Sequence, residues 1–146
     1  MPEIKNYIAV VDLGGTKILS AIINQNSEII SIAKKSTKSK KKNETIFDRI
    51  IQTIEEALAA KNLNSSQLDG IVLGIPGSLN PETRIVNLAP NLGLKNVNVA
   101  EPIEKHFNTK VLIENDANLG TLGIYHFEGK EKCKNLIALF VGTGVG

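Results

Sequence analysis

Cysteine is nearly absent from this sequence of 146 residues, and tryptophan is absent altogether. The single cysteine, Cys133, has no partner for an intramolecular disulfide, which excludes a small disulfide-stapled framework. With two tyrosines and four phenylalanines, the chain also has few rings on which bases could stack. Lys and Arg number 17 against 15 Asp and Glu, a formal net charge of only +2. We therefore expect no nucleic-acid partner.

Long apolar runs are missing as well. None approaches the roughly 20 residues that cross a bilayer, and no leader with a charged start and an apolar centre opens the sequence. We therefore expect no membrane partner and a cytoplasmic location. Hydrophobic residues nevertheless make up 42% of a chain that has the size of one ordinary domain. The sequence predicts one globular domain over residues 1–146.

Predicted strands alternate with predicted helices, which is typical of the α/β class. Apolar, β-branched runs at Tyr7–Val11, Ile18–Ile23 and Glu28–Ala33 predict a meander of three strands. The lysine-rich stretch Lys34–Lys42 that follows is expected to be a solvated edge strand or a loop. Residues 70–77 predict a buried strand that leads into a Pro-Gly turn, and residues 110–115 predict another strand. Residues 136–146 predict a last buried strand that runs into glycines.

Three helices are predicted between these strands. Asn43 or Thr45 can cap the first helix, whose apolar residues follow the 3.6-residue period and which ends near Asn62. The second begins at Pro102, since proline suits the first turn of a helix. The third begins near Asp116. The first helix is expected to lie with one face on the sheet.

A turn with the sequence "DLGGTK" follows the first predicted strand. Gly14 and Gly15 allow close approach and positive φ, so that successive N–H groups can point at one anion. The hydroxyl of Thr16 and the ammonium of Lys17 also suit phosphate oxygens. Asp12 would repel a phosphate unless Mg²⁺ lay between them, held by the carboxylate through water. The set predicts a corner that binds a nucleoside triphosphate.

The same turn can also be only a hairpin connection, which is common between apolar strands. The Walker loop and the dinucleotide fingerprint do not fit, because both place a helix after the glycines, whereas here a strand follows. Local chemistry leaves both interpretations open. A second glycine turn, with Gly142, Thr143 and Gly144 after the last predicted strand, favours phosphate binding.

A carboxylate also follows the predicted strand that ends at Asn115. Ligands of open α/β sheets bind beyond the carboxyl ends of the strands. Asp116 can be a general base that takes the proton of a substrate hydroxyl as this attacks a γ-phosphate, or it can simply cap a helix. Asn115 can bind neighbouring hydroxyls, or it can be a turn residue.

The polar stretch from Pro76 to Gly93 contains two turns bounded by prolines. They could present the backbone and side chains around Gly77, Ser78 and Asn91 to a polyol. A plain surface excursion would have the same composition.

Together these motifs resemble the amino-terminal lobe of ROK proteins. That group comprises bacterial glucokinases, other sugar and amino-sugar kinases and sugar-responsive repressors, within the actin-like ATPase superfamily. The resemblance runs from about Tyr7 to Gly146. Asp12–Lys17 is similar to the family's first phosphate motif, Glu114–Asn118 to its catalytic motif and Gly142–Gly146 to its second phosphate motif. The resemblance implies a ribonuclease H-like lobe with a mixed central sheet, the initial meander and flanking helices.

The resemblance also implies roles for individual residues. Asp116 corresponds to the catalytic base and contacts the sugar, and Asn115 corresponds to a sugar-binding residue. Sugar contacts extend to Gly77, Ser78 and Asn91. The implied reaction is ATP-dependent phosphorylation of a hexose, with glucose as the first candidate, its 6-hydroxyl as the nucleophile, and ATP and Mg²⁺ as cofactors.

Proteins of this group continue into a second lobe, which carries a Cys-rich zinc motif, further sugar ligands and the adenosine pocket. We therefore expect this chain to be a kinase fragment with little activity in isolation. Zinc is expected only in the second lobe, and a homodimer only in the complete protein. Alternatives are a kinase for fructose or an N-acetylhexosamine, a sugar-sensing ROK protein without catalysis, and a non-sugar ATPase of the actin or chaperone type.

Overall fold

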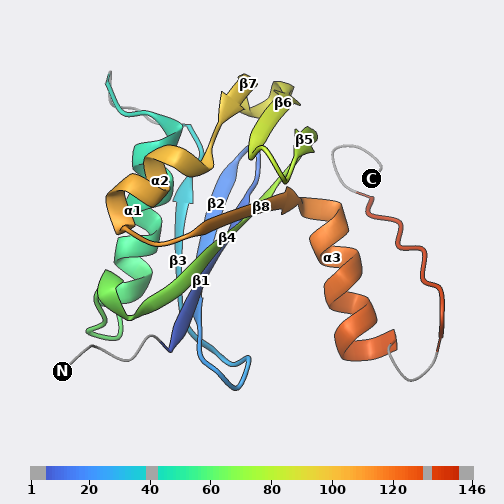
Figure 1. Cartoon of the computed structure of the whole chain (residues 1–146), viewed down its shortest axis with the longest axis horizontal. Coiled ribbons are helices and arrows are strands. Elements are labelled where there is room, and N and C mark those ends of the chain that lie inside the picture. The colour runs from blue at the N-terminus through green and yellow to red at the C-terminus, as the bar shows by residue number, and fades with distance from the viewer. Residues whose placement is uncertain (1–5, 39–42, 130–132, 142–146) are drawn as a thin grey trace.

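The computed structural model describes residues 6–38, 43–129 and 133–141, and its core is a five-stranded sheet with helices on both faces (Figure 1). In spatial order the strands are β3 (Ile29–Ser36), β2 (Lys17–Ile23), β1 (Tyr7–Leu13), β4 (Leu68–Ile75) and β8 (Val111–Asn115). Helices α1 (Ile46–Ala59) and α2 (Ala100–Phe107) lie on one face and α3 (Asp116–Ile124) lies on the other.

The pairing of these strands makes the sheet mixed. β1, β2 and β3 pair antiparallel as a meander, whereas β4 pairs in parallel with both β1 and β8. This confirms the predicted α/β class and the initial three-strand meander. Lys34 and Lys35 belong to the edge strand β3, as one of the two interpretations of the lysine-rich stretch expected. Residues 39–42 of that stretch lie outside the described residues.

One face of the sheet is tightly buried because apolar residues alternate along the strands. In β1, Ala9, Val11 and Leu13 are at most 3% exposed, and they share one core cluster with Ile50 and Ile54 of α1. Full burial of a side chain of this kind contributes roughly 1.5–3 kcal/mol. This face, packed against α1 and α2, therefore provides most of the hydrophobic stabilisation.

Helix α1 begins at a capping box. The hydroxyl oxygen of Thr45 accepts a hydrogen bond from the N–H of Asp48 (3.2 Å), and the Asp48 carboxylate accepts one from the N–H of Thr45 (2.8 Å). Thr45, rather than Asn43, is thus the N-cap. Helix α2 begins at Ala100, so Pro102 lies within its first turn. Within the described ranges, no helix is long and apolar enough to cross a membrane.

A second sheet stands beside one end of the first (Figure 1). Its strands are β5 (Ser78–Asn80), β6 (Ile85–Ala89) and β7 (Leu94–Asn98), with a short 3₁₀ helix at Pro90–Leu92 between the last two. These strands were not predicted, because they are short and the prolines and asparagines around them indicate turns. The segment is therefore ordered structure rather than a plain surface excursion.

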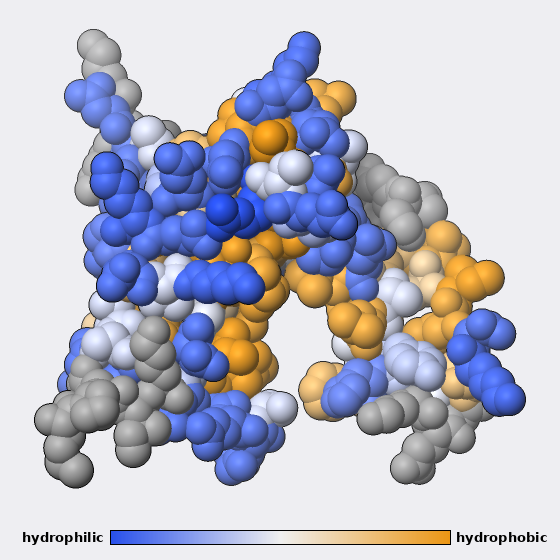
Figure 2. Space-filling view, viewed as in Figure 1, coloured by the Kyte–Doolittle hydropathy of each residue, from blue (hydrophilic) through white to orange (hydrophobic). Residues whose placement is uncertain are grey.

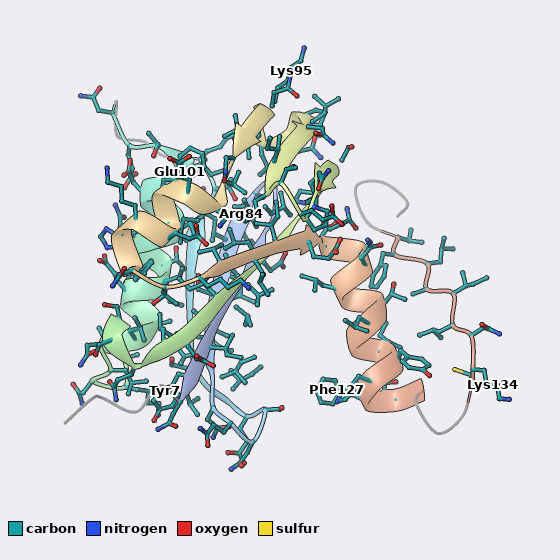
Figure 3. All side chains as sticks on the ribbon, viewed as in Figure 1. Tyr7, Arg84, Lys95, Glu101, Phe127 and Lys134 are labelled. Atoms are coloured by element: carbon teal, nitrogen blue, oxygen red, sulfur yellow. The ribbon has the colours of Figure 1, made fainter. Side chains whose placement is uncertain are left out.

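A carboxylate of α2 ties the small sheet to the main one. Arg84, labelled in Figure 3, lies between β5 and β6. It forms an ion pair with Glu104 of α2 at 2.5 Å. The other carboxylate oxygen of Glu104 accepts a hydrogen bond from the N–H of Val111 at 2.9 Å. The bond from Val111 and, to a smaller extent, the contact with Arg84 lower the pKa of Glu104. The ionised carboxylate therefore holds β8 and the β5–β6 turn at fixed positions.

The buried strand predicted at the start of residues 136–146 is wrong where the structure describes it. Residues 133–140 form no strand, and only Val141 makes an isolated bridge. Ile137 is 95% exposed, and Phe140 packs on α3, where a Cβ on Gly120 would lie 2.8 Å from its ring. An apolar run becomes a strand only when a neighbouring strand pairs with it. Residues 142–146 lie outside the described residues.

The turn that leads from β4 into the small sheet depends on glycine at position 77. Gly77 has a φ of 103°, a backbone conformation that residues other than glycine rarely adopt. A Cβ there would also lie 2.3 Å from the carbonyl oxygen of Leu88. Gly93, after the 3₁₀ helix, has a φ of 66° but no atom within 4 Å of such a Cβ.

This difference predicts unequal effects of two matched substitutions. Gly93→Ala should lower the free energy of unfolding by about 1 kcal/mol, the cost of a left-handed conformation alone. Gly77→Ala should lower it by at least twice as much, because β5 and β6 must also move apart. Urea titrations followed by circular dichroism would measure both. Equal decreases in the free energy of unfolding would show that the close contact with Leu88 does not destabilise Gly77→Ala.

Candidate functional site

The carboxyl ends of β1, β4 and β8 meet at one edge of the main sheet. The parallel register pairs Asp12 with Gly74, and Gly74 in turn with Glu114. One step further along, Asn115 pairs with Ile75, and Asp116 follows it directly. Two carboxylates that are far apart in the sequence therefore lie at the edge where sheets of this class bind ligands.

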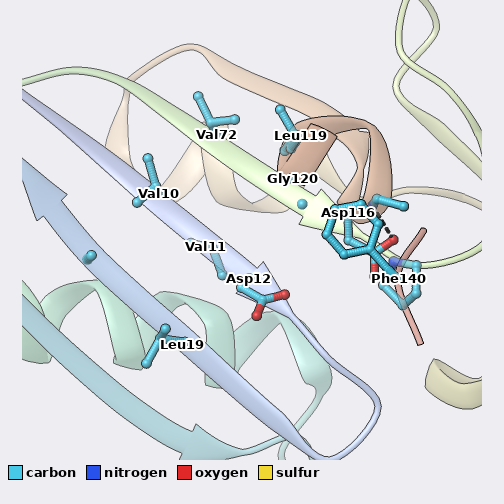
Figure 4. A pocket seen from close by; sticks show the side chains of 13 residues that line it. Val10, Val11, Asp12, Leu19, Val72, Asp116, Leu119, Gly120 and Phe140 are labelled. Carbon is cyan, nitrogen blue, oxygen red and sulfur yellow. Dashed lines mark hydrogen bonds between the residues drawn. The ribbon is translucent and has the colours of Figure 1, made fainter. Parts of the chain in front are cut away.

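A cavity of about 810 Å³ lies between this edge and α3. Figure 4 shows Asp12 at the end of β1 and Asp116 at the start of α3 on its walls, and Figure 2 shows an apolar hollow between the sheet and α3. Most of the other lining residues are apolar, among them Val10, Leu19, Val72, Leu119 and Phe140. Within the described part of the chain, Asp12 and Asp116 are the only ionisable residues that line it.

Asp12 is in an environment that disfavours its charge. Nearby protein atoms remove part of the hydration of its carboxylate, and the charge of Asp116 repels it. Desolvation, the larger cause, and this repulsion both raise the pKa of Asp12. A cation close to Asp12 would relieve both effects. The predicted role of Asp12 as a partner of Mg²⁺ is chemically consistent with this environment.

Asp116 is the first residue of α3 but not its cap. The side-chain oxygen of Asn115 accepts hydrogen bonds from the N–H groups of Ala117 (3.0 Å) and Asn118 (3.1 Å), which makes Asn115 the N-cap. The carboxylate of Asp116 is exposed and accepts one bond, from the N–H of Ala117 at 2.9 Å. Because capping is done by its neighbour, Asp116 keeps free lone pairs with which to accept a proton.

Asn115 also joins the strand end to the small sheet. Its side-chain amide donates to the carbonyl oxygen of Gly77 at 3.1 Å. Next to Gly77, the Ser78 hydroxyl accepts a bond from the amide of Asn87 at 3.3 Å. Three of the predicted sugar-binding residues, Asn115, Gly77 and Ser78, are thus brought together on the side of Asp116.

The first glycine turn lies against the other predicted sugar residue. A Cβ on Gly15 would be only 3.1 Å from the Cβ of Asn91, so glycine permits this close approach. Thr16 and Lys17 are exposed in the same turn, and the N–H of Gly14 donates to the carbonyl of Lys17 at 2.9 Å. The structure therefore places the predicted phosphate turn beside Asn91, one of the predicted sugar-binding residues.

One residue of this region was not predicted. Thr37, just after β3, is 7% exposed, and its hydroxyl donates to the carbonyl of Gly14 at 2.5 Å. Its surroundings in the sequence, "KKSTKSKKK", indicate a solvated segment. No local pattern could have identified a contact that forms only because β3 pairs with β2.

Two predicted features, the Mg²⁺ site and the second phosphate turn, cannot be formed by the described side chains alone. In residues 6–38, 43–129 and 133–141, no group of three or more His, Cys, Asp and Glu could hold a metal ion. Asp12 could therefore hold Mg²⁺ only together with water and substrate phosphates, a common arrangement for this ion. The second predicted phosphate turn, with Gly142, Thr143 and Gly144, lies outside the described residues.

Comparison with known sequences identifies relatives over almost the whole chain. The family profile described as ROK family matches residues 8–146. A glucokinase of Streptomyces coelicolor is 31% identical over 136 residues, which cover 93% of this chain and 41% of the glucokinase. A xylose repressor of Caldicellulosiruptor bescii is 32% identical over 136 residues, which cover 93% of this chain and 34% of the repressor. The chain spans less than half the length of these relatives.

A solved structure has the same fold. The crystal structure of a ROK family glucokinase from Streptomyces griseus, in complex with glucose and AMPPNP, matches with a TM-score of 0.76 and 25% sequence identity. The match covers 96% of this chain and 43% of the other. Together with the mixed sheet and its helices, this confirms the predicted actin-like ATPase lobe.

The electrostatic contact between the two carboxylates predicts a measurable shift. Asp116→Asn removes the neighbouring charge, so the pKa of Asp12 should fall, while desolvation still keeps it above its ordinary value. Carbon-detected NMR titration of the Asp12 carboxyl would measure this. Asp69→Asn, at the amino end of β4, is the matched control and should leave the titration of Asp12 unchanged. An identical Asp12 pKa in wild type and Asp116→Asn would contradict the contact.

Proposed function

We propose that this chain, which belongs to the ROK family, forms the amino-terminal lobe of an ATP-dependent sugar kinase. Glucose is the first candidate for the acceptor, with glucose 6-phosphate as the product. The similarity to the S. coelicolor glucokinase and to the S. griseus glucokinase with glucose and AMPPNP supports this proposal. Since the chain spans 41% of the first of these relatives, the activity is proposed for a longer protein in which residues 1–146 are one lobe.

The observation that carries the proposal is the division of the site between two carboxylates. Asp12 lies next to the glycine turn, in an environment that favours a nearby cation. Asp116 lies next to Asn115, whose amide contacts Gly77. One carboxylate therefore faces groups suited to phosphates, and the other faces groups suited to hydroxyls. Transfer of a phosphoryl group to a sugar needs both.

In the proposed reaction, the 6-hydroxyl oxygen attacks the γ-phosphorus of ATP. A new O–P bond forms while the bond to the bridging oxygen breaks and ADP leaves, and Asp116 accepts the hydroxyl proton. The free N–H groups of Gly15 and Thr16, with the side chains of Thr16 and Lys17, would hold the phosphates. Asp12 would hold Mg²⁺ through water, and the ion supplies charge neutralisation for the triphosphate.

The remaining predicted residues complete this assignment. Asn115, Ser78, Asn91 and the backbone at Gly77 would bind sugar hydroxyls, since amides and hydroxyls both donate and accept. The turn containing Gly142, Thr143 and Gly144 would also bind phosphate. Zinc and a homodimer interface are proposed only for the part of a longer protein beyond this lobe.

A sugar sensor without catalysis is the second candidate. The observation that favours it is the xylose repressor, which is as similar to this chain as the glucokinase is. A sensor would bind sugar without consuming ATP. A kinase for fructose or an N-acetylhexosamine would instead consume ATP with a different acceptor, and an ATPase of the actin type would do so without any sugar.

Measurement of ADP release tests these alternatives directly. The full-length gene product and residues 1–146 would be assayed in parallel with Mg-ATP and glucose, mannose, fructose, N-acetylglucosamine or N-acetylmannosamine. Stimulation by one hexose, in the full-length product, is expected. No sugar-dependent release would reject the kinase and favour the sensor or another ATPase.

Substitution of the proposed base then tests the mechanism. Asp116→Asn should lower kcat by about 10²–10⁴-fold, because the amide cannot accept the proton. Sugar affinity, measured by calorimetry, should change little, since the amide keeps the shape and polarity of the side chain. Asp69→Asn, remote from the cavity, should have wild-type kcat. Near-normal turnover by Asp116→Asn would remove Asp116 from the role of base.

A further inference from the structure

Thr37 makes two hydrogen bonds to the first glycine turn. Its hydroxyl donates to the carbonyl of Gly14 at 2.5 Å, and its backbone N–H donates to the carbonyl of Thr16 at 2.9 Å. The residue is 7% exposed, so water competes little for either bond. Thr37, which directly follows β3, thus binds two carbonyl groups of the turn that joins β1 to β2.

These bonds determine the direction of the donors on the turn. In a trans peptide unit, the carbonyl and the N–H of the next residue point in opposite directions. The carbonyl of Gly14 is turned towards Thr37, so the N–H of Gly15 points away from it. Within the described part of the chain, the N–H groups of Gly15 and Thr16 donate to no protein acceptor. They are the free donors of the turn.

Thr37 is itself held from the other side. The carbonyl of Ser36 accepts a bond from Nε of Arg49, in α1, at 2.6 Å. This carbonyl belongs to the same peptide unit as the N–H that reaches Thr16. The guanidinium of Arg49 is fixed in turn by Glu44 at 2.7 Å, and both side chains are largely buried. The contact with the glycine turn therefore extends from the rigid helix α1.

We infer that Thr37 is a positioning residue for nucleotide binding, which orients the N–H groups of Gly15 and Thr16 towards the phosphates of ATP. The inference rests on the proposed function for the identity of the ligand. Donors that are oriented before the ligand arrives need no reorganisation when charge develops on the phosphates. Thr37 does not touch the substrate, and it acts through the carbonyl of Gly14.

Three substitutions separate this role from a purely structural one. Thr37→Val keeps the size of the side chain and the backbone bond to Thr16 but removes the hydroxyl. Thr37→Ser keeps the hydroxyl. Thr53→Val is the matched control, because Thr53 is also buried and its hydroxyl donates to a backbone carbonyl, that of Arg49, at 2.6 Å within α1. The variant Thr37→Ala replaces Thr37→Val if the Thr37→Val protein does not fold.

Kinetics of the full-length protein provide the first readout. In Thr37→Val, kcat/KM for Mg-ATP should fall on the order of tenfold to a hundredfold, as expected for misplaced binding groups, while KM for the sugar stays unchanged. Thr37→Ser should restore most of the loss, and Thr53→Val should match wild type. Equal kcat/KM for ATP in Thr37→Val and Thr53→Val would overturn the inference.

A second readout does not depend on activity. In ¹⁵N-labelled residues 1–146, the amide resonances of Gly14, Gly15 and Thr16 should move in Thr37→Val, return towards wild type in Thr37→Ser and stay in place in Thr53→Val. Unmoved resonances in Thr37→Val would overturn the orienting role even if the protein is a kinase. Moved resonances in a protein that shows no sugar-dependent ADP release would uphold that role and reject the proposed function.

Discussion

Parallel pairing of β4 with both β1 and β8 is the constraint on which the site depends. It places the ends of three strands at one edge, although they come from residues near 13, 75 and 115. The pairing is held in register because one face of each strand is buried against α1 and α2, and a slip by one residue would turn the apolar side chains to the other face. The position of Asp12 relative to Asp116 is therefore a result of core packing.

The glycine turn gains its shape from the same arrangement. Glycines alone would leave the turn conformationally free, since they restrict the backbone least. The meander brings β3 beside β2, and the contacts of Thr37 and Arg49 then connect the turn to α1. Asn91 also lies against Gly15. A flexible sequence is thus enclosed by rigid neighbours, which is what a preorganised anion site requires.

The electrostatics of the edge follow from an unusual combination of polar and apolar surface. Two carboxylates share a cavity whose other walls are mostly apolar, and desolvation together with the charge of Asp116 raises the pKa of Asp12. Such an arrangement is unfavourable without a ligand and becomes favourable when a cation or a proton donor is bound. Structural hydrogen bonds are made by neighbours instead: Asn115 caps α3, and Glu104 anchors the small sheet.

Local patterns in the sequence determined the strands of the meander, the helices and the positions of Asp12 and Asp116 after strands, because periodicity, capping and glycine turns act over a few residues. The tertiary structure alone decided the rest. The bond of Asn115 to Gly77 and the contact of Thr37 with Gly14 join residues that are distant in sequence. The small sheet pairs neighbouring segments, but its strands are too short to show a clear pattern among the surrounding prolines and asparagines. The apolar run after residue 135 shows the same limit, since its composition predicts a strand but a strand forms only where another pairs with it.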